Sequence, residues 1–585
     1  MSKPIADLVA APAEWATSLA ASAGALLTGL VAAVSRPLSS GNGTSLAIRT
    51  PPKLLTALVI LSALIARIYL TRLKVPAHLR HLPRISWWAT IRLVLAQKPY
   101  FTAHADELAL VRADAYRRGL IKSPDDTPRV WARWILGHWG VVIANPVDLK
   151  LAFLQPDTFD KINLLGSANN RGSQLMGRNV VNARRDTWKI HRRVVNPAFR
   201  KGFATTLFVE PGQQLIAQLD KLADTGDRVD IIDWAQRFAL DSLSLVIFRN
   251  NFNSITDPDS AIVRTYHTAM KLLFDPLVFL FGSWADYHPA RRACFKAADD
   301  FDSYILSMIV NKKKLMAERR AAAENPNDTS DAADLLELLI DAAAEEGRNF
   351  STEELRANVT VFFVAGHDTT ATSIAYAMYF LGMNPETQRK ARAEVLSVIG
   401  DVPAGTAPEH VVFPTTQQQQ SQLPYLTMVI KEGLRIFPAT PVTLFRDLQY
   451  AATLLDGTKL PQGTRVLPNM LAVHRAHEYW GPDAGVFRPE RWENLGSVSG
   501  DAAEGTVPLH PAAHDYTWAP FGGGQRLCLG QQLSMVEQRT VLAMLLVRYE
   551  WEVVGDDAAL SGEPTTAPAM LVQVKGVYLK MTRRN

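Results

Sequence analysis

Apolar residues recur with helical spacing between about Pro99 and Gly400. Beyond that region the pattern shortens into extended pieces such as Val442–Pro468, in which Asp456-Gly457 is typical of a hairpin turn. We therefore predict a mainly α fold with a minor β region. Three polar stretches are predicted to be surface loops, namely Ala322–Ala333, Thr415–Gln422 and Glu493–Gly505.

One helix is predicted to be much longer than the others. Ser351 and Glu354 have the spacing of a capping box, and an apolar and small-residue run continues to Leu381. Asn384-Pro385 ends it, with the proline suited to start the next helix. At 1.5 Å per residue the helix is roughly 45 Å long, enough to cross a domain. In its middle, AGHDTT (Ala365–Thr370) contains poor helix formers, and a local rule broken in this way often marks a functional site.

The N-terminal region contains an apolar run, Leu54–Leu70, that is just long enough to span a bilayer if Arg67 snorkels. Basic residues follow the run, so the positive-inside rule places the downstream chain in the cytosol. Two alternatives remain: Leu54–Leu70 is a buried core helix, or Ser22–Val34 is a second, shorter membrane segment. The basic residues that follow the run are Arg72, Lys74, Arg80 and Arg84.

These features divide the chain into four parts. Residues 1–53 are a lumenal leader, 54–70 the transmembrane helix, 71–98 a basic and proline-containing hinge, and 99–585 one large domain. Asn42 begins a glycosylation sequon on the leader and is a candidate modification site.

Composition excludes several classes of protein. The 585 residues are 48% hydrophobic and 20% charged, which allows a sizeable core. The 62 basic and 57 acidic residues give a mild net charge and do not suggest nucleic-acid binding. Two cysteines, Cys294 and Cys528, exclude a disulfide framework and a zinc site built from several thiolates, and they fit a reducing compartment.

Cys528 stands in an unusual setting, the string FGGGQRLCLG (Phe521–Gly530). A glycine-rich loop costs backbone entropy, so something is expected to approach that backbone closely. A helix is predicted to begin right after the cysteine, where its positive end would stabilise a thiolate. Cys294 has no comparable surroundings and is predicted to be an inert thiol.

Five motifs in the same order along the chain resemble the cytochrome P450 superfamily. The cysteine string matches the family's F-x-x-G-x-R-x-C-x-G loop, and AGHDTT resembles its oxygen-side helix. The resemblance covers about Pro76 to the C-terminus. The other three motifs are WKIHR (Trp188–Arg192) for W-x-x-x-R, EGLR (Glu432–Arg435) for E-x-x-R, and FRPERW (Phe487–Trp492), in which Trp492 replaces the usual phenylalanine.

The resemblance implies haem b with Cys528 as the axial thiolate ligand of the iron. It also implies that the haem propionates are bound by Trp188, Arg192, Arg446 and Arg526, although Arg446 could instead be an ordinary surface arginine.

Two further sets of residues receive roles from the resemblance. Glu432, Arg435 and Arg491 are expected to form a buried structural cluster on the thiolate side.

On the oxygen side, Thr369 is expected to donate a hydrogen bond to iron-bound oxygen and Asp368 to relay protons, with Ala365 or Gly366 leaving room for O₂. The alternative for Asp368 and Thr369 is a pair that bends the helix by bonding to its own backbone. His367 receives no role.

The function implied is a membrane-anchored haem-thiolate monooxygenase of the endoplasmic reticulum that oxidises a lipophilic molecule with O₂ and NADPH-derived electrons. We expect the electrons to come from a separate NADPH-cytochrome P450 reductase, with cytochrome b5 as a second candidate donor. Lys189, Arg193 and Arg526 are candidates for a basic docking face. A merely solvated basic surface is the alternative for the two helix residues.

Two rival functions remain at this stage. One is a non-oxygenating isomerase or dehydratase of the same fold, and the other is a haem carrier or sensor. Asp368 and Thr369 argue against the first rival. The long leader is typical of fungal members, for which a terpenoid, polyketide or fatty-acid-derived substrate of secondary metabolism is expected. The GHDTT sequence resembles that of family members that hydroxylate fatty chains.

The predicted topology can be tested by protease protection. If Leu54–Leu70 is a single span with the large domain in the cytosol, protease added to intact microsomes should remove that domain. Protection of the whole domain until detergent is added would overturn this orientation.

Overall fold

The computed structural model describes Arg67 and residues 73–135, 137–162, 171–200, 202–273, 286–322, 333–345, 351–403, 405–495, 516–555, 557–567 and 571–584. Three predicted features lie outside these residues: the apolar run Leu54–Leu70 apart from Arg67, the second apolar stretch Ser22–Val34, and the sequon at Asn42. Within the described ranges, no helix combines the length and the apolar character that crossing a membrane requires.

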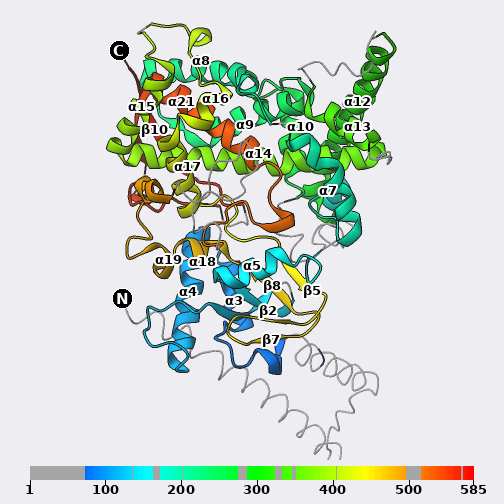
Figure 1. Cartoon of the computed structure of the whole chain (residues 1–585), viewed down its shortest axis with the longest axis vertical. Helices are drawn as coiled ribbons and strands as arrows, with labels where there is room; N and C mark the ends of the chain where they lie inside the picture. The colour runs from blue at the N-terminus through cyan, green and yellow to red at the C-terminus, as the bar shows by residue number, and fades with distance from the viewer. Residues whose placement is uncertain are drawn as a thin grey trace, which may run out of the picture.

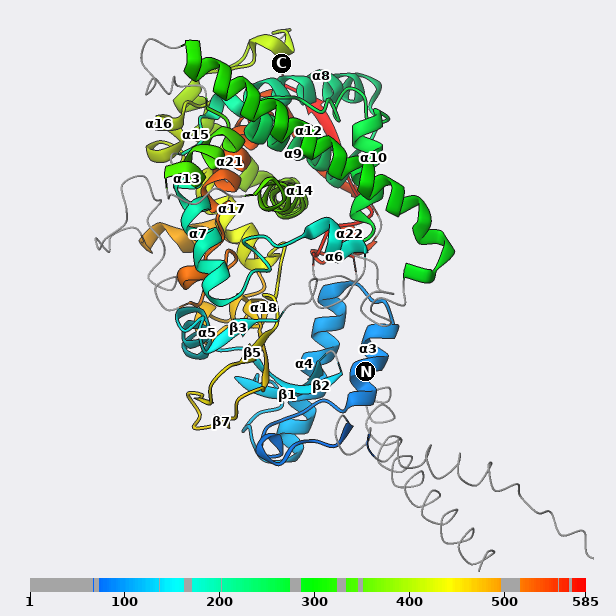
Figure 2. The same cartoon turned by 90° about the vertical axis from the view of Figure 1, so that its right-hand side faces the viewer.

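The fold is organised around α14 (Thr352–Met383), which runs across the molecule in Figure 1 and is seen nearly end-on in Figure 2. Its predicted start is confirmed, because Ser351 and Glu354 form a capping box. Its predicted end is confirmed too, since Asn384 caps α15 (Pro385–Ile399) with Pro385 in the first turn. A long helix, mostly buried on both sides of its middle, is thereby fixed at both ends.

Helices form the larger part of the fold, as predicted, and pack on α14. Among them α9 makes the most extensive contact with it, and Figure 2 shows α9 and α12 crossing beside it. The helices of this part, besides α14 and α15, are α7 (Arg185–Arg200), α8 (Val209–Thr225), α9 (Ile231–Phe248), α10 (Ala261–Met270), α12 (Arg292–Ala322), α13 (Leu335–Glu345), α17 (Pro424–Ile436) and α21 (Gln531–Arg548).

The minor β region is larger than the sequence pattern indicates. Its main sheet has the strand order β1-β2-β8-β5-β3, and three of these strands lie in the region where helical spacing dominates. The sequence pattern did not identify them, because β1 and β2 are mostly buried and so lack polar alternation. The strands are β1 (Val130–Ile135), β2 (His138–Ile143), β3 (Phe159–Lys161), β5 (Arg446–Leu448) and β8 (Arg465–Pro468).

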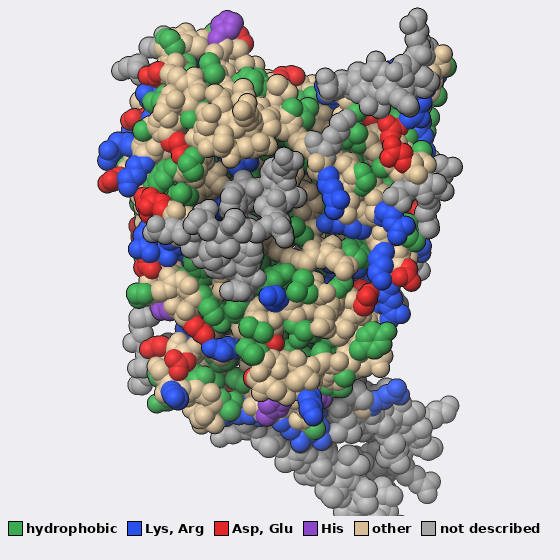
Figure 3. Space-filling view, in the orientation of Figure 1, with side chains coloured by type: hydrophobic (Ala, Val, Ile, Leu, Met, Phe, Trp, Pro, Cys, Tyr) green, Lys and Arg blue, Asp and Glu red, His purple; other side chains and the backbone are tan. Residues whose placement is uncertain are grey.

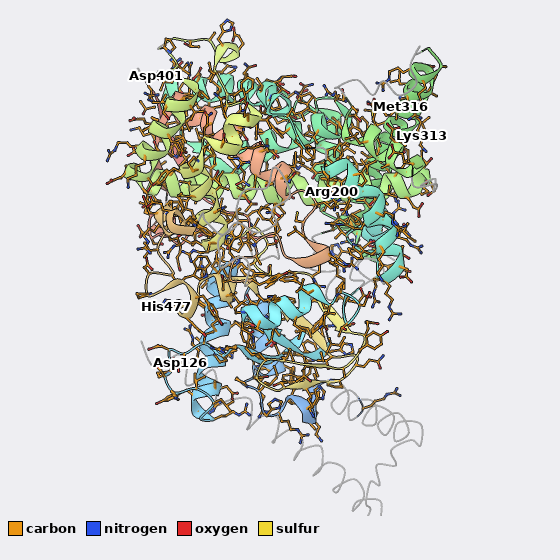
Figure 4. The ribbon with its side chains drawn as sticks, viewed as in Figure 1. Asp126, Arg200, Lys313, Met316, Asp401 and His477 are labelled. Carbon is orange, nitrogen blue, oxygen red and sulfur yellow. The ribbon has the colours of Figure 1, made fainter. Side chains whose placement is uncertain are left out.

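Three helices accompany this sheet in the lower part of Figure 1, which Asp126 and His477 mark in Figure 4. Leu79, Leu82 and Ile85 are buried there, so the folded domain includes residues before Pro99. The helices are α3 (Trp87–Leu95), α4 (Tyr100–Arg117) and α5 (Pro146–Leu154), and further short helices of the fold are α6 (Arg171–Met176), α18 (Met470–His474), α19 (His477–Trp480) and α22 (Asp557–Leu560).

The predicted hairpin is confirmed: β6 (Ala452–Thr453) pairs antiparallel with β7 (Lys459–Leu460), and Gly457 in the turn has φ +84°. A second small sheet joins β4 (Val229–Asp230), β10 (Val577–Arg583) and β9 (Tyr549–Gly555).

One predicted loop is wrong. Within Thr415–Gln422, residues Thr416–Ser421 form α16, capped by Thr415 and Gln418. Gln419 is buried and donates to the hydroxyl of Thr540 at 2.6 Å. Local composition does not reveal a long-range contact of this kind. The predicted loops Ala322–Ala333 and Glu493–Gly505 lie largely outside the described residues.

Candidate functional site

The glycine-rich loop before Cys528 is pressed against its neighbours. Gly524 has φ +61°, and a Cβ there would lie 2.3 Å from the carbonyl oxygen of Phe153 in α5. A Cβ on Gly523 would lie 2.2 Å from the ring of Tyr516. The close approach expected from the sequence therefore exists, and α5 and Tyr516 supply part of it.

Cys528 is accessible although protein atoms surround its thiol. The residue is exposed, yet burial is the largest influence on its thiol and raises its pKa above the ordinary value. The amides of Gly530 and Gln531 and the charges of Arg192 and Lys161 act in the opposite direction. The predicted helix after the cysteine is confirmed as α21, which begins at Gln531. Its N-terminus and the two cations act in favour of a thiolate, while burial, the larger influence, acts against it.

Arg526 lies inside the fold beside Trp188. Its guanidinium carbon is 4.0 Å from the centre of the Trp188 ring, and it donates to the carbonyl of Ala183 at 3.0 Å. The side chain is 4% exposed, with a nitrogen 3.6 Å from Asp160. Burial lowers the pKa of Arg526 to about 9. Its predicted place on a docking surface is wrong, because the side chain does not reach the surface.

Strand pairing adds a residue that the sequence does not single out. In the β3–β5 ladder Lys161 lies directly opposite Arg446. Arg446 is 2% exposed and is therefore no surface arginine, and burial lowers its pKa to about 10. Burial, and after it the charges of Arg526, Arg446 and Arg192, lower the pKa of Lys161 well below its ordinary value. The pairing joins positions far apart in the chain, and no local motif marks Lys161.

These side chains form what we call the cationic cluster, consisting of Lys161, Arg192, Arg446 and Arg526. Asp160 offers it one carboxylate, which also accepts from Arg184 at 2.8 Å. The Nε atoms of Arg446 and Arg526 are buried without a hydrogen-bond partner, and buried donors require acceptors. Two added carboxylates, such as haem propionates, would supply them. The residues present therefore fit haem.

The middle of α14 has an accessible face. Ala365 is exposed and Thr369, one turn later, is half-buried, although most of the helix is buried. Gly366 points elsewhere, since a Cβ on it would lie 3.2 Å from Leu243 of α9. Of the two small residues considered for the O₂ side, Ala365 is the accessible one, and Gly366 allows close packing of two helices.

Thr369 bonds within α14, whereas its neighbour Thr370 bonds to another helix. The hydroxyl of Thr369 donates to the carbonyl of Ala365 at 2.6 Å, the bond expected for a helix-bending residue, while its oxygen lone pairs can still accept. Thr370 donates to the hydroxyl of Ser534 at 3.1 Å. Because Ser534 lies in the first turns of α21, this bond ties the accessible part of α14 to the helix that follows Cys528.

Asp368 is held by side chains from distant parts of the chain. Its Oδ1 accepts from the amide of Gln236 at 2.9 Å and from that of Gln573 at 3.0 Å, and the carboxylate is 14% exposed. Neither glutamine was identified from the sequence, because neither belongs to a local motif.

Glu432, Arg435 and Arg491 come together as one buried cluster. Arg435 makes two hydrogen bonds of 2.9 Å to the Glu432 carboxylate, and both side chains are fully buried. Arg491 donates to the same carboxylate at 2.8 Å. The indole N–H of Trp492 adds a bond of 3.0 Å to Glu432, a contact that phenylalanine at this position could not make.

Comparison with known proteins now decides the family. A family model described as Cytochrome P450 matches residues 125–581. The chain belongs to this family. Rat "Cytochrome P450 4A14" is 28% identical over 68% of this chain and 73% of its own length. Mouse "Cytochrome P450 4A10" is 26% identical over 81% and 87%. Pig "Taurochenodeoxycholic 6 alpha-hydroxylase" is 28% identical over 67% and 71%.

The expected cofactor and reaction class follow from membership. This P450 is a haem-thiolate monooxygenase that oxidises a lipophilic small molecule with O₂ and electrons from NADPH, which reach it through a reductase. The mainly helical P450 fold with its minor sheet is confirmed.

The identity of the ligating cysteine can be tested by spectroscopy. We expect the reduced, carbon monoxide-treated protein to show the red-shifted Soret band of thiolate ligation. Cys528→His should abolish this band. Cys294→Ser should retain it, because Cys294 is a half-buried residue of α12. Loss of the band in the Cys294 variant instead would reverse the assignment.

The role of Lys161 can be tested by haem retention. Lys161→Met removes one cation from the cationic cluster, and a hydrogen bond to a charged group typically contributes enough to weaken haem binding roughly ten- to hundredfold. Transfer of haem to excess apomyoglobin measures this loss. Lys189→Met is the control, since Lys189 is 46% exposed. Equal transfer rates for both variants would remove Lys161 from the site.

Proposed function

We propose that this P450 hydroxylates an aliphatic carbon of a lipophilic substrate, with Cys528 as the iron ligand and with Thr369 and Asp368 on the oxygen side. The observation that carries the proposal is the Thr370–Ser534 hydrogen bond of 3.1 Å. It joins α14 beside Thr369 to α21 just after Cys528, and both Cys528 and Ala365 are exposed.

The cofactor supplies cleavage of the O–O bond when it is held by a cysteine thiolate. In our proposal the cationic cluster binds the two propionates, with Trp188 beside them. Unpartnered Nε atoms on Arg446 and Arg526 support this assignment. The Glu432–Arg435–Arg491 cluster acts structurally by fixing α17 against the loop of Arg491.

On the oxygen side, Thr369 and Asp368 deliver protons in our proposal. The Thr369 hydroxyl donates to Ala365, so its oxygen is oriented to accept a hydrogen bond from the accessible side. Asp368 is partly exposed and held at Oδ1 by two amides. We propose that it passes protons to Thr369 as a positioned acid.

The substrate class rests on two supports. The pig relative is named "Taurochenodeoxycholic 6 alpha-hydroxylase", so its printed activity is a hydroxylation. In this chain, Ala365 leaves an apolar methyl group at the accessible face. We propose a molecule with an extended aliphatic part, derived from a fatty acid, terpenoid or polyketide.

We propose that α7 presents the docking face for the reductase. Lys189, Arg193 and Arg200 on this helix are exposed. Figure 3 shows Lys and Arg side chains gathered on the side where Figure 1 places α7, and Figure 4 labels Arg200 at its end. Opposite charge on a partner would steer its approach.

A membrane location is proposed from the N-terminal region. The helix α3 exposes Trp88 (45%), Val94 (48%) and Leu95 (62%), and only Thr90 of its nine residues is buried. Tryptophan and aliphatic residues of this kind suit a bilayer interface. The proposal includes a single anchor at Leu54–Leu70 in the endoplasmic reticulum membrane, with modification of Asn42 on the lumenal side.

The oxygen-side assignment is tested by Thr369→Ala. The variant should keep haem and substrate binding but lose the oriented hydroxyl. NADPH use should then continue while product per NADPH falls and hydrogen peroxide rises. A general acid step is typically worth about 10²–10⁴-fold, and water can replace part of it, so we expect a loss of at least roughly tenfold in coupling.

NADPH, peroxide and product are measured together for both proteins. Unchanged coupling in the variant would return Thr369 to the role of a residue that bends its own helix.

A further inference from the structure

A buried histidine lies next to Asp368 and has partners on both ring nitrogens. His367 is 1% exposed. Its Nε2 is 3.1 Å from the backbone carbonyl oxygen of Gln236. Its Nδ1 is 3.0 Å from the hydroxyl of Tyr266 in α10 and 3.3 Å from Oδ1 of Asp368. Gln236 thus contacts both residues, since its side-chain amide donates to the same Oδ1.

The partner at Nε2 fixes one proton. A backbone carbonyl only accepts, so Nε2 must carry hydrogen in every state of the ring. Nδ1 is then the position whose proton can come and go. In the neutral ring, Nδ1 accepts from the Tyr266 hydroxyl. In the imidazolium, Nδ1–H donates to Asp368.

Tyr266 can serve both states because it has a second acceptor. Its hydroxyl oxygen is 3.4 Å from the carbonyl oxygen of Phe363, so the phenol can turn from Nδ1 to that carbonyl when Nδ1 is protonated. Burial, and then the charge of Asp368, raise the pKa of the Tyr266 phenol well above its ordinary value. The phenol therefore stays protonated, and its O–H group can rotate between the two acceptors.

We propose that His367 is the proton reserve for Asp368, acting through it as a positioning residue of the oxygen side. When Asp368 has given its proton to the site, the Nδ1–H of the imidazolium is transferred to Oδ1. The carboxyl is thereby restored, the ring becomes neutral, and the Tyr266 hydroxyl turns to Nδ1. This inference rests on the proposed function and adds to it the source of the proton.

An exposed histidine of α10 lies beside the ring of His367. His267 is exposed, and its ring centre is 6.1 Å from that of His367. Burial is the largest influence that lowers the pKa of His267, and the charge of His367 lowers it further, whereas Asp368 and Asp233 raise it. Besides His367, the charged groups that face His267 are Asp368, Asp233 and Lys271.

The test compares His367→Gln and Tyr266→Phe with the parent protein in the reconstituted system with reductase and NADPH. Glutamine keeps an amide that can bond Gln236 but holds no transferable proton. We expect product per NADPH to fall roughly tenfold in His367→Gln, less than for a residue at the site itself, and by a smaller factor in Tyr266→Phe. The loss should grow in D₂O relative to the parent protein, because proton resupply becomes slow. A purely structural role would not change this isotope effect.

A second measurement is independent of turnover. In the reduced, carbon monoxide-bound protein labelled with ¹⁵N-histidine, we expect the neutral His367 ring to carry its proton on Nε2. The Nδ1 resonance of His367 should shift in Tyr266→Phe. His104→Gln is the matched control, since His104 is also buried and hydrogen-bonded, but to Asn469. It should keep the parent coupling and isotope effect.

The outcomes separate this inference from the proposed function. If Thr369→Ala uncouples the enzyme while His367→Gln and Tyr266→Phe keep the parent coupling and isotope effect, the inference alone is wrong. If Thr369→Ala leaves coupling unchanged, the oxygen-side proposal fails as well. Should His367→Gln not retain haem, Tyr266→Phe and the NMR shift decide.

Discussion

Several cations are buried in one region of this fold, and the rest of the site depends on how their charge is balanced. Lys161, Arg446 and Arg526 all have pKa values lowered chiefly by burial. Removing charges from water is costly unless opposite charge and hydrogen bonds compensate. Asp160 provides only part of that compensation, and buried Nε atoms remain without acceptors. The protein's own acceptors therefore do not satisfy the cationic cluster, and two propionates would stabilise it. Binding of haem and stability of the domain should consequently be coupled.

The Glu432 cluster solves the same physical problem in the opposite way. Its carboxylate accepts from Arg435, Arg491, Trp492 and the amide of Arg488, and Arg435 uses its remaining donors on the carbonyls of His474 and Ala484. Every charge there has a partner within the protein. A satisfied network of this kind rigidifies its surroundings, whereas the cationic cluster has donors left over for a ligand. The contrast separates a structural group from a binding group even though both are buried and ionic.

The sequence predicted those parts of the molecule that are encoded locally. The bounds of α14, the helix after Cys528, the hairpin at Gly457 and the mainly helical fold follow from caps, turns and periodicity. Strands β1 to β3 were missed because buried strands show no polar alternation, and α16 was missed because its polar composition favoured a loop although Thr415 and Gln418 form a capping box. Site residues divide in the same way. Motifs identified Cys528 and Arg526, but Lys161 depends on a strand register, and Gln573 lies 205 positions from Asp368.

The AGHDTT segment shows why helix rules are broken at this place. Three of its helix-weakening residues have a partner on another element: Gly366 admits Leu243 of α9, Asp368 binds Gln236 and Gln573, and Thr370 binds Ser534 of α21. Poor intrinsic propensity is thus offset by tertiary contacts. Thr369 is different, because its hydroxyl bonds only to its own helix, at Ala365. Its side chain is the one in the segment that is both polar and turned to the accessible face without a tertiary partner, which is the arrangement expected of a group whose partner arrives with the substrate and oxygen.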